Sequence, residues 1–147
     1  MPFAERFAAF SSGAFFLAGL GFGVWKYVAL ARSSDARAPV DVDIAHRAAL
    51  LYAFACLVVE RFAALSALAP ELEVAAVVAQ IAFFALGLST YVVHGVLRDT
   101  ENQFEKPHRL GKRTVPPALV VAFMVALVAA ELGGFAVLFF GACTAPA

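Results

Sequence analysis

The chain has 147 residues, of which 63% are apolar and 15% are charged, and its formal net charge is zero. Few soluble folds of this length could hide so much apolar surface, so the composition predicts a membrane protein. A net charge of zero argues against nucleic acid as a partner. The two cysteines, Cys56 and Cys143, form no CxxC motif and indicate neither a disulfide framework nor covalent haem attachment.

Four apolar runs predict four transmembrane helices, which makes the expected fold class an all-α integral membrane protein. The first run is uncharged from Phe7 to Trp25 and can cross most of a hydrocarbon core about 30 Å thick. Lys26 follows where a signal peptide would need a small-residue cleavage site, so we expect this helix to be retained. The expected helices of this single membrane domain span residues 7–30, 44–68, 72–98 and 116–141, with loops at 31–43 and 99–115. Asp43 is expected to cap the second helix.

Basic residues are concentrated on one side of these predicted spans. Nine of the eleven lie in or beside loops 31–43 and 99–115, whereas Arg6 alone lies near the opposite surface. The positive-inside rule therefore predicts both loops in the cytosol and both termini on the extracytoplasmic side. We expect an antiparallel up-and-down bundle of four helices in the bacterial inner, or cytoplasmic, membrane.

One layer of polar side chains lies far from the predicted cytosolic side. It consists of Glu60, Arg61, Gln80 and Glu131. Glu60 lies 14 residues beyond His46, and Glu131 lies 14 residues beyond Pro117, which is about 21 Å in each case. Unpaired charges at such depth are costly, so we expect Arg61 to pair with Glu60 or Glu131. Two alternatives are a proton or ion path through the carboxylates, and extension of Glu60 and Arg61 to the outer surface.

A second polar layer lies at the predicted cytosolic rim. The stretch from Tyr91 to Thr114 contains two of the three histidines and five of the eleven basic residues. On the third helix, spacings of four and three place six residues on one face: Gln80, Phe84, Gly87, Tyr91, His94 and Arg98. Candidate binding residues for a polar group, small anion or cofactor are His46, Tyr91, His94, Arg98, Asp99, Asn102, His108 and Arg109.

Antiparallel packing of the second and third helices would bring His46 and His94 to one height. These imidazoles could hold a non-covalent haem, or a divalent metal with help from nearby carboxylates such as Asp99. The spacing matches no compact metal motif, so no metal site is assigned. The alternative without a ligand is that each histidine is an interfacial residue bonded to a carbonyl or to water.

The first helix carries a GxxxG spacing at Gly19 and Gly23. This spacing lets another helix approach closely. We expect the pair to pack against a partner subunit or a second copy of the chain.

Four helices in about 150 residues, with two cytosolic loops, resemble the membrane-associated glutathione and eicosanoid enzymes. Those proteins are trimers that bind glutathione between subunits near the cytosolic face. Their second helix opens with Arg-Ala-His-x-Asn-x-x-Glu, and here only Ala45 and His46 match. Ala48 and Leu51 stand in place of the Asn and the Glu, so the resemblance covers the architecture and not the glutathione-binding residues.

The expected function is that of a small accessory or assembly subunit with a polar or cofactor site at its cytosolic rim, rather than that of an enzyme. Its expected partners are the lipid bilayer and other membrane subunits or its own copies. The alternatives are a membrane enzyme that uses His46, Tyr91 and His94, and a proton or ion carrier that uses Glu60 and Glu131. The sequence holds no Walker loop and no GxSxG motif.

Overall fold

Helices dominate the computed structural model, which describes residues 1–145. They are α1 (Phe3–Arg32), α2 (Val40–Leu65), α3 (Pro70–Leu97) and a fourth segment made of α4 (Pro117–Val128), the π-helical turn η1 (Ala129–Gly133) and α5 (Gly134–Cys143). All four helical segments are long and apolar enough to cross a membrane, which confirms the prediction of an all-helical chain with four candidate membrane spans. Each observed boundary lies within four residues of the predicted one.

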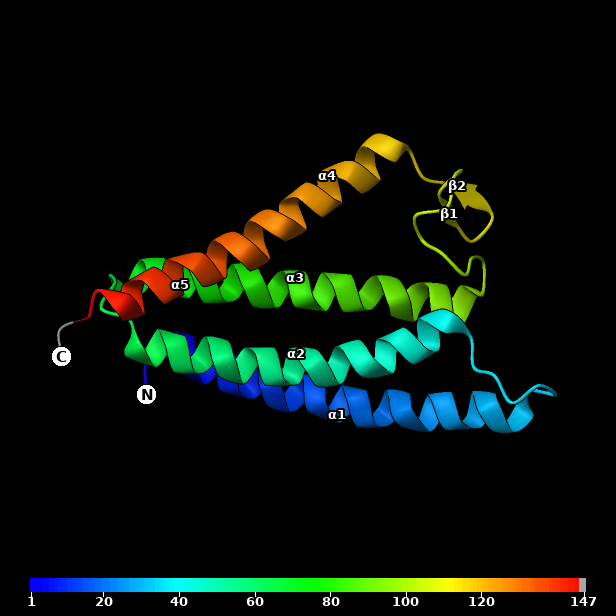
Figure 1. The fold of residues 1–147 in the computed structure, drawn as a ribbon, viewed down its shortest axis with the longest axis horizontal. Coiled ribbons are helices and arrows are strands. Elements are labelled where there is room, and N and C mark those ends of the chain that lie inside the picture. Colours follow the sequence, from blue (N-terminus) through cyan, green and yellow to red (C-terminus); the bar gives the residue numbers. More distant parts are fainter. Residues whose placement is uncertain (146–147) are drawn as a thin grey trace.

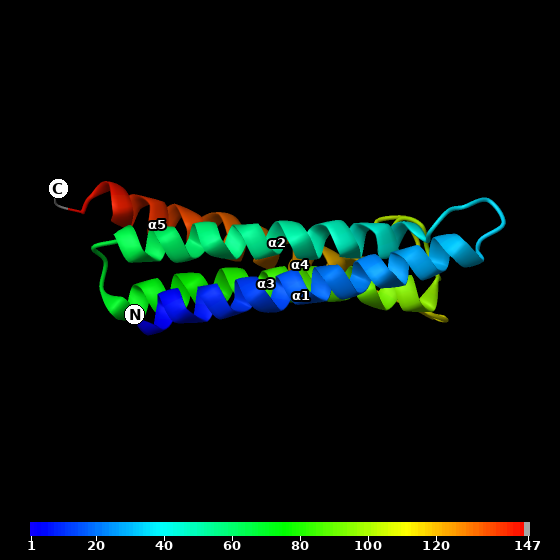
Figure 2. The ribbon, with the colours of Figure 1, turned by 90° about the horizontal axis from the view of Figure 1, so that it is seen from below.

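The helices run back and forth between two ends of the molecule (Figure 1). The loop end carries the connections 33–39 and 98–116, and the terminal end carries the N-terminus, the turn 66–69 and the end of α5. α1 contacts both α2 and α3, and the view from below shows it lying over them (Figure 2). α5 packs on α2 and α3 near the terminal end, whereas α4 rises away from α3 toward the loop end (Figure 1).

The second helix begins four residues before the predicted start at residue 44. Pro39 precedes its first residue, Val40, and proline is well suited to a helix start because it fixes φ and lacks an N–H. Asp43 was expected to cap the helix but lies in its first turn. Its carboxylate pairs instead with Lys26 of α1 at 2.5 Å and with Arg47 at 2.8 Å.

Small side chains line the contact between α1 and α2. α1 buries Ala4, Ala8, Ser12 and Gly19 beside the larger Phe15, and α2 buries Ala45, Ala49, Ala53 and Cys56 among others. We call these small residues of the two contacting helices the α1–α2 seam. Small residues at intervals of three and four let helix backbones approach closely. A Cβ atom added at Gly19 would lie only 2.7 Å from Leu50 Cδ2, which shows how tight the seam is.

The glycine pair of the first helix faces α2 of the same chain. His46 Nδ1 lies 2.8 Å from the carbonyl oxygen of Gly19, and a Cβ at Gly23 would lie 3.0 Å from the His46 ring. The expectation that this pair faces a partner or a second copy is therefore corrected. The close approach that the spacing predicted is present, and it is intramolecular.

Candidate binding site between α3 and α4

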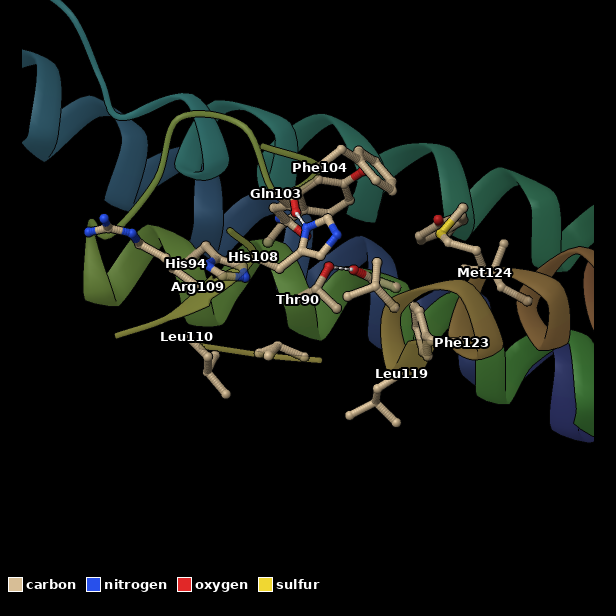
Figure 3. A pocket seen from close by; sticks show the side chains of 16 residues that line it. Thr90, His94, Gln103, Phe104, His108, Arg109, Leu110, Leu119, Phe123 and Met124 are labelled. Atoms are coloured by element: carbon tan, nitrogen blue, oxygen red, sulfur yellow. Dashed lines mark hydrogen bonds between the residues drawn. The ribbon is translucent and has the colours of Figure 1, made fainter. Parts of the chain in front are cut away.

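A cavity of about 560 Å³ lies between α3 and α4, where the two helices diverge toward the loop end (Figure 3). We call it the wedge cavity. Its α4 wall consists of Leu119, Val120, Phe123, Met124 and Leu127. Its polar lining consists of Tyr52, Thr90, Tyr91, His94, Gln103, His108 and Arg109. The site is thus apolar along one helix and polar where the connection 98–116 closes it.

His94 and Asp99 form a buried pair at the loop end of the cavity. Arg98 ends α3 in a left-handed conformation, with φ of 50°, and this turns the chain so that Asp99 folds back toward His94. The His94 Nδ1 atom lies 2.7 Å from Asp99 Oδ1, and the two side chains are 10% and 7% exposed. A carboxylate only accepts hydrogen bonds, so Nδ1 donates; when the ring is neutral, Nε2 then keeps a free lone pair.

The carboxylate of Asp99 is held in its ionised form. Its second oxygen, Oδ2, accepts a hydrogen bond from the Gly111 N–H. Burial disfavours the charge, but the hydrogen bonds from His94 and Gly111 outweigh it and hold the pKa of Asp99 below its usual value of 3.8. Gly111 has φ of 61° in the two-residue turn between β1 (Arg109–Leu110) and β2 (Arg113–Thr114), a hairpin that the sequence did not predict.

His108 presents a second imidazole to the same cavity and is only 6% exposed. Its Nδ1 lies 3.3 Å from the carbonyl oxygen of Gln103, which can only accept, so this nitrogen also donates. In the neutral ring the Nε2 atom again keeps a free lone pair. Figure 3 shows the ring between Gln103 and Thr90. The Gln103 side chain is itself anchored, because its amide donates to the buried carboxylate of Asp41 at 2.8 Å.

The predicted rim residues separate into two groups. Tyr91, His94, Asp99, His108 and Arg109 lie at or beside the wedge cavity, although the Arg109 guanidinium points away from it (Figure 3). His46 is elsewhere, on the α1 side of α2, so the site for haem or metal between His46 and His94 is not assembled. Arg98 borders a different hollow beside α1, and Asn102 is an exposed residue whose side chain accepts the Phe104 N–H.

The predicted ion pair of the deeper polar layer is not formed. No Lys, Arg or His nitrogen within residues 1–145 lies within 4.0 Å of a carboxylate oxygen of Glu60 or Glu131. Arg61 is exposed on the surface of α2, which agrees with the alternative that it extends outward. Gln80 is 1% exposed and donates to the Ala76 carbonyl, and the Glu131 Oε1 atom is buried without a hydrogen-bond partner. The expectation that Arg61 pairs with Glu60 or Glu131 is therefore wrong.

Several residues of the site were not identified from the sequence. Tyr52 reaches the cavity from α2, held by a stack on Phe84 with ring centroids 4.6 Å apart. Its hydroxyl lies beside Gly87, where an added Cβ would be in ordinary contact at 3.5 Å. Gly87 lies on the α3 face from Gln80 to His94 that the sequence predicts. The sequence of α4 is apolar on every side, so it does not indicate which of its residues line the cavity. Among residues 1–145 no cluster of three metal-ligating side chains is present.

Comparison with known proteins finds no matching family, no similar curated protein and no similar solved structure. The wedge cavity is therefore interpreted from its own chemistry.

Proposed function

We propose that this protein is a multi-pass inner-membrane protein that binds an amphipathic small molecule in the wedge cavity. The distribution of basic residues favours a cytosolic loop end and extracytoplasmic termini for the four-helix, up-and-down bundle. The observation that carries the proposal is the combination of an apolar α4 wall with two buried imidazoles at one end of a single cavity. An apolar body would lie along α4, and a polar end would meet His94 and His108.

The polar end of the ligand is expected to donate hydrogen bonds. His94 and His108 each commit Nδ1 as a donor, so in their neutral forms both offer Nε2 as an acceptor. A hydroxyl or amide N–H group satisfies such acceptors, whereas a phosphate does not unless an imidazole is protonated. The Arg109 guanidinium, which would favour an anion, points away from the cavity.

Binding is favoured over catalysis as the role of the site. Thr90 supplies the aliphatic hydroxyl of the lining, but this group already donates to the Gly87 carbonyl at 2.8 Å, so its proton is not directed at an imidazole. We further propose that the chain holds the amphiphile as an accessory subunit of a membrane complex or of a homo-oligomer. A membrane enzyme is the second candidate, because Asp99 orients His94 as a general base would need.

Native mass spectrometry of the protein purified from membranes in mild detergent tests the proposal. We expect one retained small molecule per chain in the wild type. Gly87→Leu, which fills the floor of the cavity, and His108→Phe, which removes one acceptor, should both lose it. Gly21→Leu is the control, because a Cβ at Gly21 meets nothing within 4 Å. Absence of any bound molecule from the wild type, or equal retention in all four proteins, would contradict the proposal. Recovery of a chemically altered molecule would favour the enzyme.

A further inference from the structure

Glu131 is an acidic residue in the middle of the fourth apolar helical segment. It lies in η1, where a π-helical turn interrupts the fourth helical segment, and single π-helical turns are frequent at functional sites. Its Oε1 atom is buried and has no hydrogen-bond partner. The cation predicted to neutralise it, Arg61, is exposed on α2 instead.

Within residues 1–145, no Lys, Arg or His nitrogen lies within 4.0 Å of a Glu131 carboxyl oxygen. From α2, the Tyr52 side chain lines the cavity floor together with Leu127, which lies one helical turn before Glu131. From α3, the neighbouring polar side chain is Gln80, which is in contact range of Gly134 at the start of α5. An ionised carboxylate without a neighbouring cation is energetically unfavourable inside a membrane. The Glu131 carboxyl group is therefore stable there as the neutral acid, with its proton bound.

The lining of the wedge cavity ends one helical turn before Glu131. Along α3 its lining runs from His94 to Gly87, which is seven residues or about 10 Å. At its floor lie Tyr52 and Leu127, and Leu127 is four residues, about one helical turn, from Glu131. The floor of the cavity therefore adjoins the turn that carries the carboxyl group.

Between Glu131 and the terminal end of the molecule, α3 and α5 are tightly packed. Gln80 is 1% exposed and Leu138 is fully buried. A Cβ at Gly134 would lie 2.8 Å from Gln80 Cγ and 3.1 Å from the Ala76 carbonyl oxygen, so α3 and the start of α5 are in direct contact. Nearer the terminal end, Gly141 packs equally closely against Ser66 and Leu68.

From this arrangement we infer that Glu131 is a proton-binding site within the membrane that exchanges protons with the loop-end side, through the wedge cavity, and not with the terminal-end side. This inference goes beyond the proposed ligand binding and does not depend on the identity of the amphiphile. Under this inference the wedge cavity has two roles, as a ligand site near His94 and as an access path to Glu131.

Labelling with dicyclohexylcarbodiimide tests the inference on the intact protein in proteoliposomes. This membrane-permeant reagent reacts with a carboxyl group that carries its proton. The acid adds across one C=N bond, so that oxygen binds the central carbon and the proton moves to nitrogen. Peptide mass spectrometry then locates the adduct. The pH is set independently on the two sides of the membrane, with the protein in each orientation.

Labelling at Glu131 should rise several-fold as the pH of the loop-end compartment falls, and it should not change with the pH of the terminal-end compartment. Glu60 is the matched internal control, because it lies five residues from the end of α2 and should follow the terminal-end pH. Gly87→Leu should reduce labelling of Glu131 but not of Glu60. Labelling of Glu131 that follows the terminal-end pH, or that responds to neither side, would overturn the inference even if the wedge cavity binds an amphiphile.

Discussion

The α1–α2 seam and the wedge between α3 and α4 are both helix contacts in a strongly apolar chain, yet one is closed and the other is open. In the seam, small residues such as Ala8, Ala45 and Ala49 are fully buried. α4 is richer in Val, Leu, Phe and Met, and none of its twelve residues is buried. Hydrophobicity alone does not explain the difference, because both faces are apolar.

The comparison shows that side-chain size determines which helices pack closely in this protein. Lipid tails are as apolar as leucine, so burial against another helix gains little in a bilayer, and close packing of small residues becomes the main attraction. The seam uses this attraction to fix α1 on α2. The large side chains of α4 keep it apart from α3 and leave room for a ligand.

The largest expected effect is at the seam. Gly19→Leu should lower the free energy of unfolding by about 3 kcal/mol or more, because its Cβ would lie 2.7 Å from Leu50 and 3.2 Å from the Leu50 backbone nitrogen. Thermal unfolding in detergent measures the loss. Gly21→Leu, on the same helix in open space, should melt like the wild type. Equal melting temperatures for both variants would show that the seam is not tightly packed.

A smaller loss is expected where the connection 98–116 closes the wedge. Asp99→Asn should cost about 2 kcal/mol, because hydrogen bonds that a buried carboxylate accepts from His94 and Gly111 are weakened or lost. Glu105→Gln, at an exposed residue of the same connection, is the control and should cost far less.

The same aspartate should give a distinct pH dependence. The pKa of Asp99 is lowered in the folded state, so its stabilisation is complete above the unfolded value of 3.8 and is lost as the pH falls below that value through the folded pKa. The stability difference between wild type and Asp99→Asn should therefore shrink only in strong acid. A difference that shrinks between pH 5 and 7 would contradict this assignment.

Filling the floor of the wedge with a single methyl group should be harmless. Gly87→Ala places a Cβ in ordinary contact, 3.5 Å from the Tyr52 hydroxyl and 3.7 Å from Leu127. It should raise the free energy of unfolding by about 0.5–1 kcal/mol, because alanine is the better helix former. Chemical denaturation measures the gain, and a clear loss of stability would mean that α3 and α4 are packed closely at this point.

The smallest effect is expected from the ion pairs beside the seam. Asp43→Asn removes partners of Lys26 and Arg47, but the Asp43 and Lys26 side chains are each 31% exposed and Arg47 is 63% exposed. Screening by solvent limits the cost to about 0.5 kcal/mol, and added salt should reduce it further. A loss comparable to that of Gly19→Leu would mean that charge, rather than packing, holds α1 on α2.

The helices and one face of the site could be predicted from the sequence because both leave a pattern. Apolar runs indicate the four spans, and the three- and four-residue spacing places Gln80, Tyr91 and His94 on one face of α3. The pairing of His94 with Asp99 could not be predicted, because it depends on the left-handed turn at Arg98. The open wedge could not be predicted either, since α4 is apolar on every side.

The error in the deeper polar layer has a geometric cause. Depth on the second helix was measured from His46, but α2 begins at Val40, six residues earlier. Six residues correspond to about 9 Å of helix, so Glu60 and Arg61 lie nearer the terminal end than Glu131. That offset separates Arg61 from the carboxylate it was expected to neutralise.

Disulfide trapping in membranes tests most directly the claim that α3 and α4 are closed at one end and open at the other. In a chain with both native cysteines replaced, Gln80→Cys with Gly134→Cys probes the closed end, where a Cβ at Gly134 would lie 2.8 Å from Gln80 Cγ. Thr90→Cys with Leu119→Cys probes opposite walls of the wedge cavity. A disulfide needs Cβ atoms about 3.8 Å apart, so mild oxidation should cross-link the first pair and leave the second free. Equal cross-linking of both pairs would mean that α4 closes on α3 along its whole length and that no wedge cavity exists.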